Sequence, residues 1–112
     1  MAPAAGGRNR RLALHLAEHL ERGLPSGYDV VCDLERMPRE LRGQHRRNPV
    51  NRPRLAGVQI ELPPSVRWNH DEANWSDFAG TGRAPQIDRL IDALVEGVTA
   101  WLEDLDVTPA AS

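Results

Sequence analysis

The chain has no lysine, and its 14 basic residues are all arginine, a bias that with abundant alanine, glycine and proline is typical of a GC-rich genome. It has one cysteine, Cys32, which excludes an intramolecular disulfide and a cysteine-based metal cluster. No apolar run approaches the roughly 20 residues that span a membrane, and residues 1–7 lack the apolar core of a signal peptide. These absences predict a protein without disulfides or membrane contact, with the cytoplasm as the default location.

The length of 112 residues and the apolar content of 40% suit one domain over residues 1–112, or part of a larger domain. Leucines and alanines recur at helical spacing over residues 8–23, and valines over residues 28–33 predict a short strand. Residues 1–7 are expected to be flexible, and residues 68–82 to form a variable surface loop. The order of elements predicts the α/β class.

A second helix is expected to begin at Pro85, because proline suits a first helical position. Apolar side chains recur after it at helical spacing, and we expect them to form one stripe from which Asp88, Asp92, Glu96 and Glu103 face away. The members of this stripe are Ile87, Leu90, Ile91, Leu94, Val98, Trp101, Leu102 and Leu105.

The stretch Gly-Val-Gln-Ile-Glu-Leu over residues 57–62 predicts a strand, because apolar residues alternate with Gln59 and Glu61. Pro63 and Pro64 follow and cannot continue a ladder of hydrogen bonds. Glu61 is therefore expected at the carboxyl end of its strand, where open α/β sheets bind ligands.

Residues 36–54, called the basic loop from here on, contain seven arginines and one acidic residue, Glu40. This charge predicts an acidic partner. Arginine pairs bidentately with carboxylate or phosphate, and prolines at positions 49 and 53 favour an extended backbone that would hold Asn51 and Arg52 in place. A solvated surface explains the seven arginines as a group, but Arg52 is a candidate anion ligand.

His15, Glu18 and His19 match an H-x-x-E-H zinc motif, and Glu96 lies at a suitable distance downstream for a further ligand. Their place opposite the leucine stripe favours a solvated helix face instead. Cys32 lies among valines and is expected to be a small buried hydrophobic residue.

Three blocks of this sequence resemble the carboxyl-terminal half of the poly-γ-glutamate hydrolase family. They are GGRNRRL, RELRGQHRRNPVNR and GVQIELPPSVR, and they extend over residues 6–67. The resemblance implies a zinc-dependent amidohydrolase with a carboxypeptidase-like (phosphorylase/hydrolase-like) three-layer αβα fold. The expected substrate is poly-γ-glutamate or a similar polyanionic peptide, cleaved at the γ-amide bond.

The resemblance also implies roles for individual residues. Glu61 matches the general base, and Asn51 and Arg52 match the pair that would hold a substrate carboxylate. Arg42 and Asn48 are supporting candidates for substrate binding. Poly-γ-glutamate carries a free α-carboxylate on every residue, which suits an arginine-rich groove.

The family's zinc ligands lie upstream of the glycine pair at positions 6 and 7. The expectation is therefore an amino-terminally truncated member that binds no zinc by itself, is inactive alone, and requires a missing segment or partner chain. One alternative is a non-enzymatic module whose basic loop binds an acidic protein or, less expected, nucleic acid. The other is a minimal metallopeptidase at His15 and His19.

Overall fold

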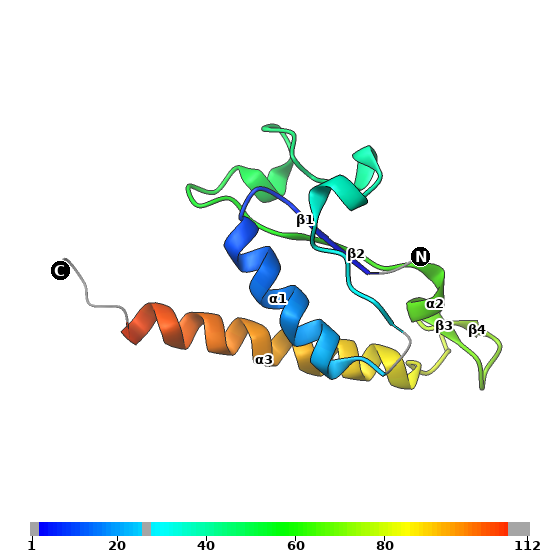
Figure 1. The fold of residues 1–112 in the computed structure, drawn as a ribbon. Coiled ribbons are helices and arrows are strands. Elements are labelled where there is room, and N and C mark those ends of the chain that lie inside the picture. Colours follow the sequence, from blue (N-terminus) through cyan, green and yellow to red (C-terminus); the bar gives the residue numbers. More distant parts are fainter. Residues whose placement is uncertain (1–2, 26–27, 108–112) are drawn as a thin grey trace.

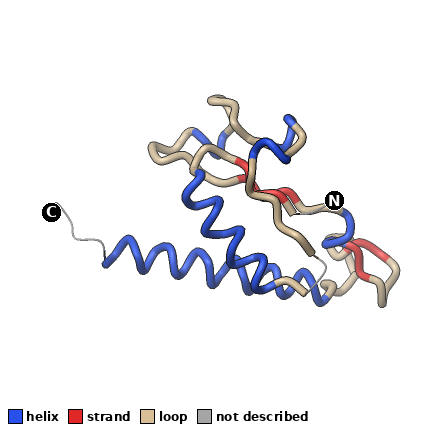
Figure 2. The backbone as a smooth tube through the Cα atoms, in the orientation of Figure 1, coloured by secondary structure: helices blue, strands red, loops and turns tan. Residues whose placement is uncertain are grey.

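A computed structural model describes residues 3–25 and 28–107 as a small mixed α/β structure (Figures 1 and 2). Two antiparallel two-stranded sheets accompany two long helices and one short helix. The strands are β1 Ala4–Gly6, β2 Gln59–Glu61, β3 Trp68–Asn69 and β4 Asn74–Trp75. The helices are α1 Arg10–Gly23, α2 Pro64–Arg67 and α3 Pro85–Val107, with 3₁₀ turns at Leu34–Arg36, Arg39–Leu41 and Pro49–Asn51.

The prediction of flexibility before Gly7 is wrong for residues 3–7, which are all buried. β1 pairs with β2 on one side, with Ala4 opposite Glu61. On its other side Ala4 forms a parallel bridge to Val31, and the Ala5 N–H donates to the Val31 carbonyl at 2.9 Å. Residues 1 and 2 lie outside the described residues.

The strand expected over residues 28–33 is reduced to this single bridge at Val31. The chain turns directly afterwards, because the Asp33 side chain accepts from the Glu35 N–H at 3.0 Å and caps the 3₁₀ turn Leu34–Arg36. The prediction therefore identified an extended segment, but the turn leaves it too short for a strand.

Helix α1 begins at Arg10, two residues later than predicted, because Asn9 caps it. The Asn9 Oδ1 atom accepts from the Leu12 N–H at 3.1 Å. The Arg8 N–H donates instead to the Asn51 side chain in the basic loop. The residues before Asn9 thus belong to the turn between β1 and α1.

Helix α1 contacts β1 on one side and α3 on the other (Figure 1). Small residues bring the two helices together: a Cβ on Gly23 would lie 2.7 Å from the Ala93 Cβ, and one on Gly97 would lie 3.0 Å from the Leu16 Cδ2. The core that these elements form is a cluster of buried apolar side chains. Its buried members are Ala17, Leu20, Leu24, Val30, Val66, Leu90 and Ala93.

Helix α3 begins at Pro85 as predicted, and only part of its apolar stripe is buried. Leu90 is 5% exposed, whereas Val98 is 45% and Leu102 is 54% exposed. Helix α1 crosses α3 and covers only one side of it. Among the described residues, no helix has the length and apolarity needed to cross a membrane.

The segment expected to be a variable loop over residues 68–82 contains the hairpin of β3 and β4. The rings of Trp68 and Trp75 meet edge to face at 4.9 Å across it. Asn69 is buried, and its side chain donates to the Gly82 carbonyl at 2.8 Å. Pro63 and Pro64 end β2 as predicted, and Pro64 also begins α2.

Candidate active site

Three stretches of backbone meet at glycines around the turn between β1 and α1. Gly7 has a φ of +91°, and a Cβ there would lie 2.3 Å from the Gly57 carbonyl oxygen. A Cβ on Gly6 would lie 2.6 Å from the Arg42 carbonyl oxygen, and one on Gly57 would lie 2.6 Å from that of Val50. The turn is therefore in backbone contact with both ends of the segment that carries the predicted substrate-binding residues.

Hydrogen bonds reinforce this backbone contact. The Gly7 N–H donates to the Arg42 carbonyl at 2.8 Å, and the Asn9 N–H donates to the Gly57 carbonyl at 3.1 Å. Gln44 adds a side-chain bond, because its Nε2 donates to the Gly7 carbonyl at 2.6 Å. The β1–α1 turn thus satisfies the Arg42 carbonyl of the basic loop, and the loop in turn satisfies the Gly7 carbonyl.

Asn51 is the side chain that joins the basic loop to the start of α1. Its Oδ1 accepts from the Arg8 N–H at 2.9 Å. Its Nδ2 donates to the carbonyls of Gly43 at 2.7 Å and His45 at 3.0 Å. Both amide hydrogens are therefore used within the protein, and in this conformation Asn51 holds the loop in shape.

Arg52 follows directly and has a different environment. Its side chain is exposed and makes no hydrogen bond or ion pair within residues 3–25 and 28–107. It lines an open hollow of about 460 Å³ together with Arg46 and Arg47. Sequence reasoning singled out Arg52 but neither Arg46 nor Arg47, and the structure brings these three arginines together.

Arg42 is half-buried, and its Nε donates to the Met37 carbonyl at 3.1 Å. Its own carbonyl accepts from Gly7. In this structure Arg42 thus supports the basic loop.

Glu61 is half-buried on β2 and is linked to the basic loop through Gln59. The Asn48 Nδ2 donates to the Gln59 Oε1 at 2.9 Å, and the Gln59 Nε2 donates to the Glu61 Oε1 at 3.0 Å. The other carboxylate oxygen, Oε2, makes no hydrogen bond among the described residues. One oxygen of Glu61 is therefore held, and the other has no hydrogen-bond partner in the described part of the chain.

The direction of this chain of hydrogen bonds is determined by the backbone. The Asn48 Oδ1 accepts from the Val50 N–H at 3.1 Å, and a backbone N–H can only donate. The Asn48 amide must therefore present its Nδ2 to Gln59, which must in turn present its own Nε2 to Glu61. A turn in the basic loop thus determines that Gln59 donates a hydrogen bond to the Glu61 carboxylate.

Sequence reasoning missed the positioning roles of Gln59, Gln44 and Arg10. The alternation along β2 did place Gln59 beside Glu61 on one face, which was the available signal. Arg10 donates through Nη1 to the carbonyls of Ala5 at 3.1 Å and Gly7 at 2.9 Å. The sequence carries no signal for the contacts of Gln44 and Arg10. The contact of Gln44 joins residues distant along the chain, and those of Arg10 depend on the turn of the backbone at Gly7.

Cys32 is half-buried and contacts Arg10, whose Nη2 lies 3.7 Å from its Sγ. Burial raises the pKa of the Cys32 thiol, and the nearby Arg10 charge opposes this only in part. A raised pKa keeps the thiol protonated at neutral pH, which disfavours a nucleophilic role. Cys32 packs partly against the core, in line with the sequence interpretation.

The prediction of a solvated face at the H-x-x-E-H motif is wrong for His15. Its Nε2 lies 2.7 Å from the Gly97 carbonyl oxygen, and its ring lies 5.2 Å from that of Trp101 on α3. His15 is thus part of the contact between the two helices. Within the described ranges, no three His, Cys, Asp or Glu side chains are grouped so that they could hold a metal ion.

Comparison with known proteins assigns the family. The chain shows no match to curated proteins or to solved structures. The family model described as poly-gamma-glutamate hydrolase matches residues 2–86, which include Glu61, the linked Asn48 and Gln59, and the whole basic loop. This match extends over most of the chain and contains every residue of the site described above, so the protein belongs to the poly-γ-glutamate hydrolase family.

Proposed function

We propose that this protein hydrolyses γ-glutamyl amide bonds in poly-γ-glutamate with Glu61 as the general base. The observation that carries the proposal is the family match over residues 2–86, which contains the candidate base and its hydrogen-bonded partners. The held carboxylate oxygen and the free one on Glu61 support it, because a general base needs both a defined orientation and an accessible oxygen.

The basic loop would bind the substrate through Arg52. Poly-γ-glutamate presents a free carboxylate on each residue, and guanidinium groups pair with carboxylates in a bidentate geometry. The hollow lined by Arg46, Arg47 and Arg52 offers three such groups without protein partners among the described residues. Asn51 would act by holding Arg52 in place, since both of its amide hydrogens are already donated.

The steps assigned to this chain are proton transfers and substrate orientation. Glu61 would accept a proton through Oε2 from the water that attacks the γ-amide carbonyl. The C–N bond then breaks, and the same carboxyl would return the proton to the leaving amine. Gln59 would keep the carboxylate aimed throughout by holding Oε1.

The zinc ion that the resemblance implies does not fit the described side chains, because no three potential ligands are grouped there. No step is therefore assigned to a metal, and we propose that this chain by itself holds none. Elemental analysis after dialysis tests this directly. One tightly held zinc ion per chain would contradict it.

We also propose that the described α/β unit belongs to a carboxypeptidase-like three-layer architecture. The support is the position of β1, which has a bridge partner on one side and β2 on the other, with α1 packed against it. In this proposal β1 and β2 form part of the central layer. A small-angle scattering profile or an experimental structure of the full protein would test it.

The alternative function is polyanion binding without catalysis, which the exposed arginine hollow favours. The deciding experiment incubates the purified chain, with and without added zinc, with poly-γ-glutamate and measures both binding and the release of new amino groups. Hydrolysis that disappears in Glu61→Gln supports the hydrolase. Binding without hydrolysis under every condition would favour the alternative, as well as the expectation from the sequence that the chain is inactive alone.

A further inference from the structure

Helix α3 carries a second apolar face in addition to the one that packs on α1. Five large apolar side chains on it are between 36% and 61% exposed. Their positions are separated alternately by four and three residues, which is the heptad spacing of a seam between two helices. The exposed stripe consists of Ile91, Val95, Val98, Leu102 and Leu105.

This exposed stripe is not needed for the contact between α1 and α3. Leu90 and Ala93 are buried on the other side of α3, and Gly97 lies against Leu16 and His19 of α1. The carboxyl-terminal end of α3 extends beyond α1 (Figure 1), and the family match ends at residue 86, before the stripe begins. A continuous exposed apolar surface of this kind marks an interaction site.

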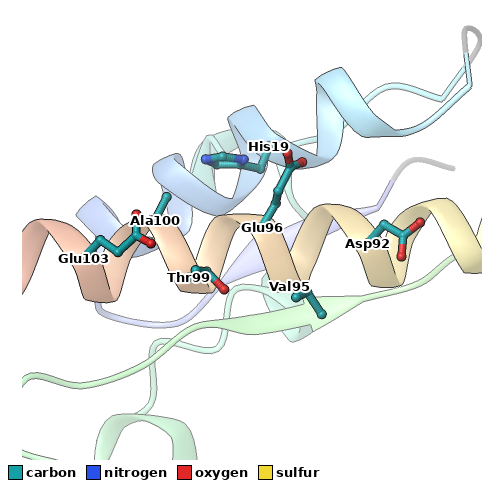
Figure 3. A pocket seen from close by; sticks show the side chains of 7 residues that line it. All are labelled: His19, Asp92, Val95, Glu96, Thr99, Ala100 and Glu103. Carbon is teal, nitrogen blue, oxygen red and sulfur yellow. The ribbon is translucent and has the colours of Figure 1, made fainter.

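An acidic hollow of about 620 Å³ lies beside the stripe, between α1 and α3 (Figure 3). Val95 belongs to both features. The carboxylates of the hollow form no ion pair within the described part of the chain. The residues that line it are His19, Asp92, Val95, Glu96, Thr99, Ala100 and Glu103.

We propose that the stripe and the hollow together dock an amphipathic helix of a partner protein, with apolar residues in heptad spacing and arginine or lysine along one flank. The apolar residues would cover the stripe, and the basic flank would lie over Asp92, Glu96 and Glu103. From Ile91 to Leu105 the stripe is roughly 20 Å long, which corresponds to about four helical turns. This proposal does not depend on the hydrolase function.

Charge distinguishes this occupant from a second copy of α3. The polar face of α3 carries Asp92, Glu96 and Glu103 against one arginine, Arg89, and Asp88 is already paired with Arg83 at 3.1 Å. Pairing two such helices would place like charges beside each other and weaken the contact. A basic flank satisfies the same carboxylates instead.

The test uses two synthetic helical peptides with leucine at the heptad positions. One carries arginine at the flanking positions, the other glutamate, and binding to the full chain is measured by fluorescence anisotropy at low and moderate salt. The arginine peptide should bind at least tenfold more tightly, with an affinity that falls as salt rises. Equal binding of both peptides, or no binding of either, would overturn the proposal.

Substitutions then locate the site. Leu102→Asp should weaken binding at least tenfold, because it places an unpaired charge in the apolar contact. Leu14→Asp is the matched control, since Leu14 is 53% exposed on α1 and Leu102 is 54% exposed. The control should bind like the wild type, and circular dichroism checks that both variants are folded. Equal losses in both would place binding elsewhere.

Reversal of charge keeps the test valid if Leu102→Asp is misfolded. A double variant, Glu96→Arg with Glu103→Arg, should bind the arginine peptide about three- to tenfold less and the glutamate peptide more tightly. Sedimentation of the wild type tests whether a second copy of the chain occupies the stripe instead. A dimer that Leu102→Asp dissociates would show that a second copy covers the stripe, contrary to the proposal.

Discussion

The basic loop and α3 are attached to the rest of the molecule by different forces. The loop is held by close backbone contacts at Gly7 and Gly57 and by hydrogen bonds from side-chain amides such as that of Asn51. Helix α3 is held by apolar contact, where Leu90 and Ala93 pack against α1. One region depends on directional contacts between defined atoms, and the other on buried area.

This difference explains what each region leaves free. Hydrogen bonds in the loop use the amides and the backbone, so the guanidinium groups of Arg46, Arg47 and Arg52 remain available to a ligand. Packing of α3 uses one side of the helix, so an apolar stripe remains on the other. In our two proposals the loop therefore binds an anion, and α3 binds an apolar partner.

The largest expected effect concerns Glu61. Under conditions in which the wild type hydrolyses poly-γ-glutamate, Glu61→Gln should lower the rate by about 10²- to 10⁴-fold, because the amide cannot accept the proton of the attacking water. Release of amino groups measures the rate, and calorimetry measures binding, which should be unchanged. Undiminished hydrolysis in this variant would assign the base to another residue.

The next effect tests the backbone contact of the loop. Gly7→Ala should destabilise the fold by about 4 kcal/mol, because the new Cβ would lie 2.3 Å from a backbone oxygen. Gly80→Ala is the matched control, since Gly80 has a φ of +88° and nothing within 4 Å of its Cβ position. The control should lose only about 1 to 2 kcal/mol from backbone strain. Urea unfolding measures both, and similar losses would show that the close contact is unimportant.

The third prediction tests the apolar contact that holds α3 against α1. Leu90→Ala should cost about 3 kcal/mol, because Leu90 is 5% exposed and its removal leaves a cavity. Leu102→Ala, at a side chain that is 54% exposed, should cost less than about 1 kcal/mol. Thermal unfolding of the two variants checks this. A large loss for Leu102 would mean that the stripe already has a partner within the folded protein.

The fourth prediction asks whether Arg52 binds the substrate. Arg52→Lys should weaken binding of poly-γ-glutamate by about ten- to a hundredfold, because lysine lacks the bidentate fork, with little change in stability. Arg54→Ala, an exposed arginine of the same loop outside the hollow, should have a small effect that salt removes. Comparable losses in both variants at high salt would assign binding to the loop as a whole.

The smallest effect on the rate should come from Gln59, which contacts Glu61 and, in the proposed function, does not contact the substrate. Gln59→Leu should reduce kcat about three- to tenfold with little change in KM, because it removes one hydrogen bond that orients the base. An increase in KM with no change in kcat would show that Gln59 binds the substrate. Gln59→Glu would place two carboxylates side by side, and its rate should also lie below that of the wild type.

Much of the fold and some of the site could be predicted from the sequence. Periodicity predicted α1, β2 and α3, and the alternation in β2 placed Gln59 and Glu61 on one face. It did not predict β1, because a short run of alanine and glycine has no pattern of its own. The role of Asn51 was also beyond it, since the carbonyls that accept its hydrogens belong to other residues of a nonrepetitive loop.

By itself, the sequence determined the family, the positions of the two long helices and the excess of arginine in the basic loop. These follow from local periodicity, charge and matching blocks of residues. Only the tertiary structure decided that Asn48, fixed by the Val50 N–H, donates to Gln59, and that Gln59 in turn donates to Glu61. It also decided that half of the apolar stripe on α3 is exposed. Hydrogen-bond direction and burial depend on which distant segments meet, and the pattern of a single segment does not contain that information.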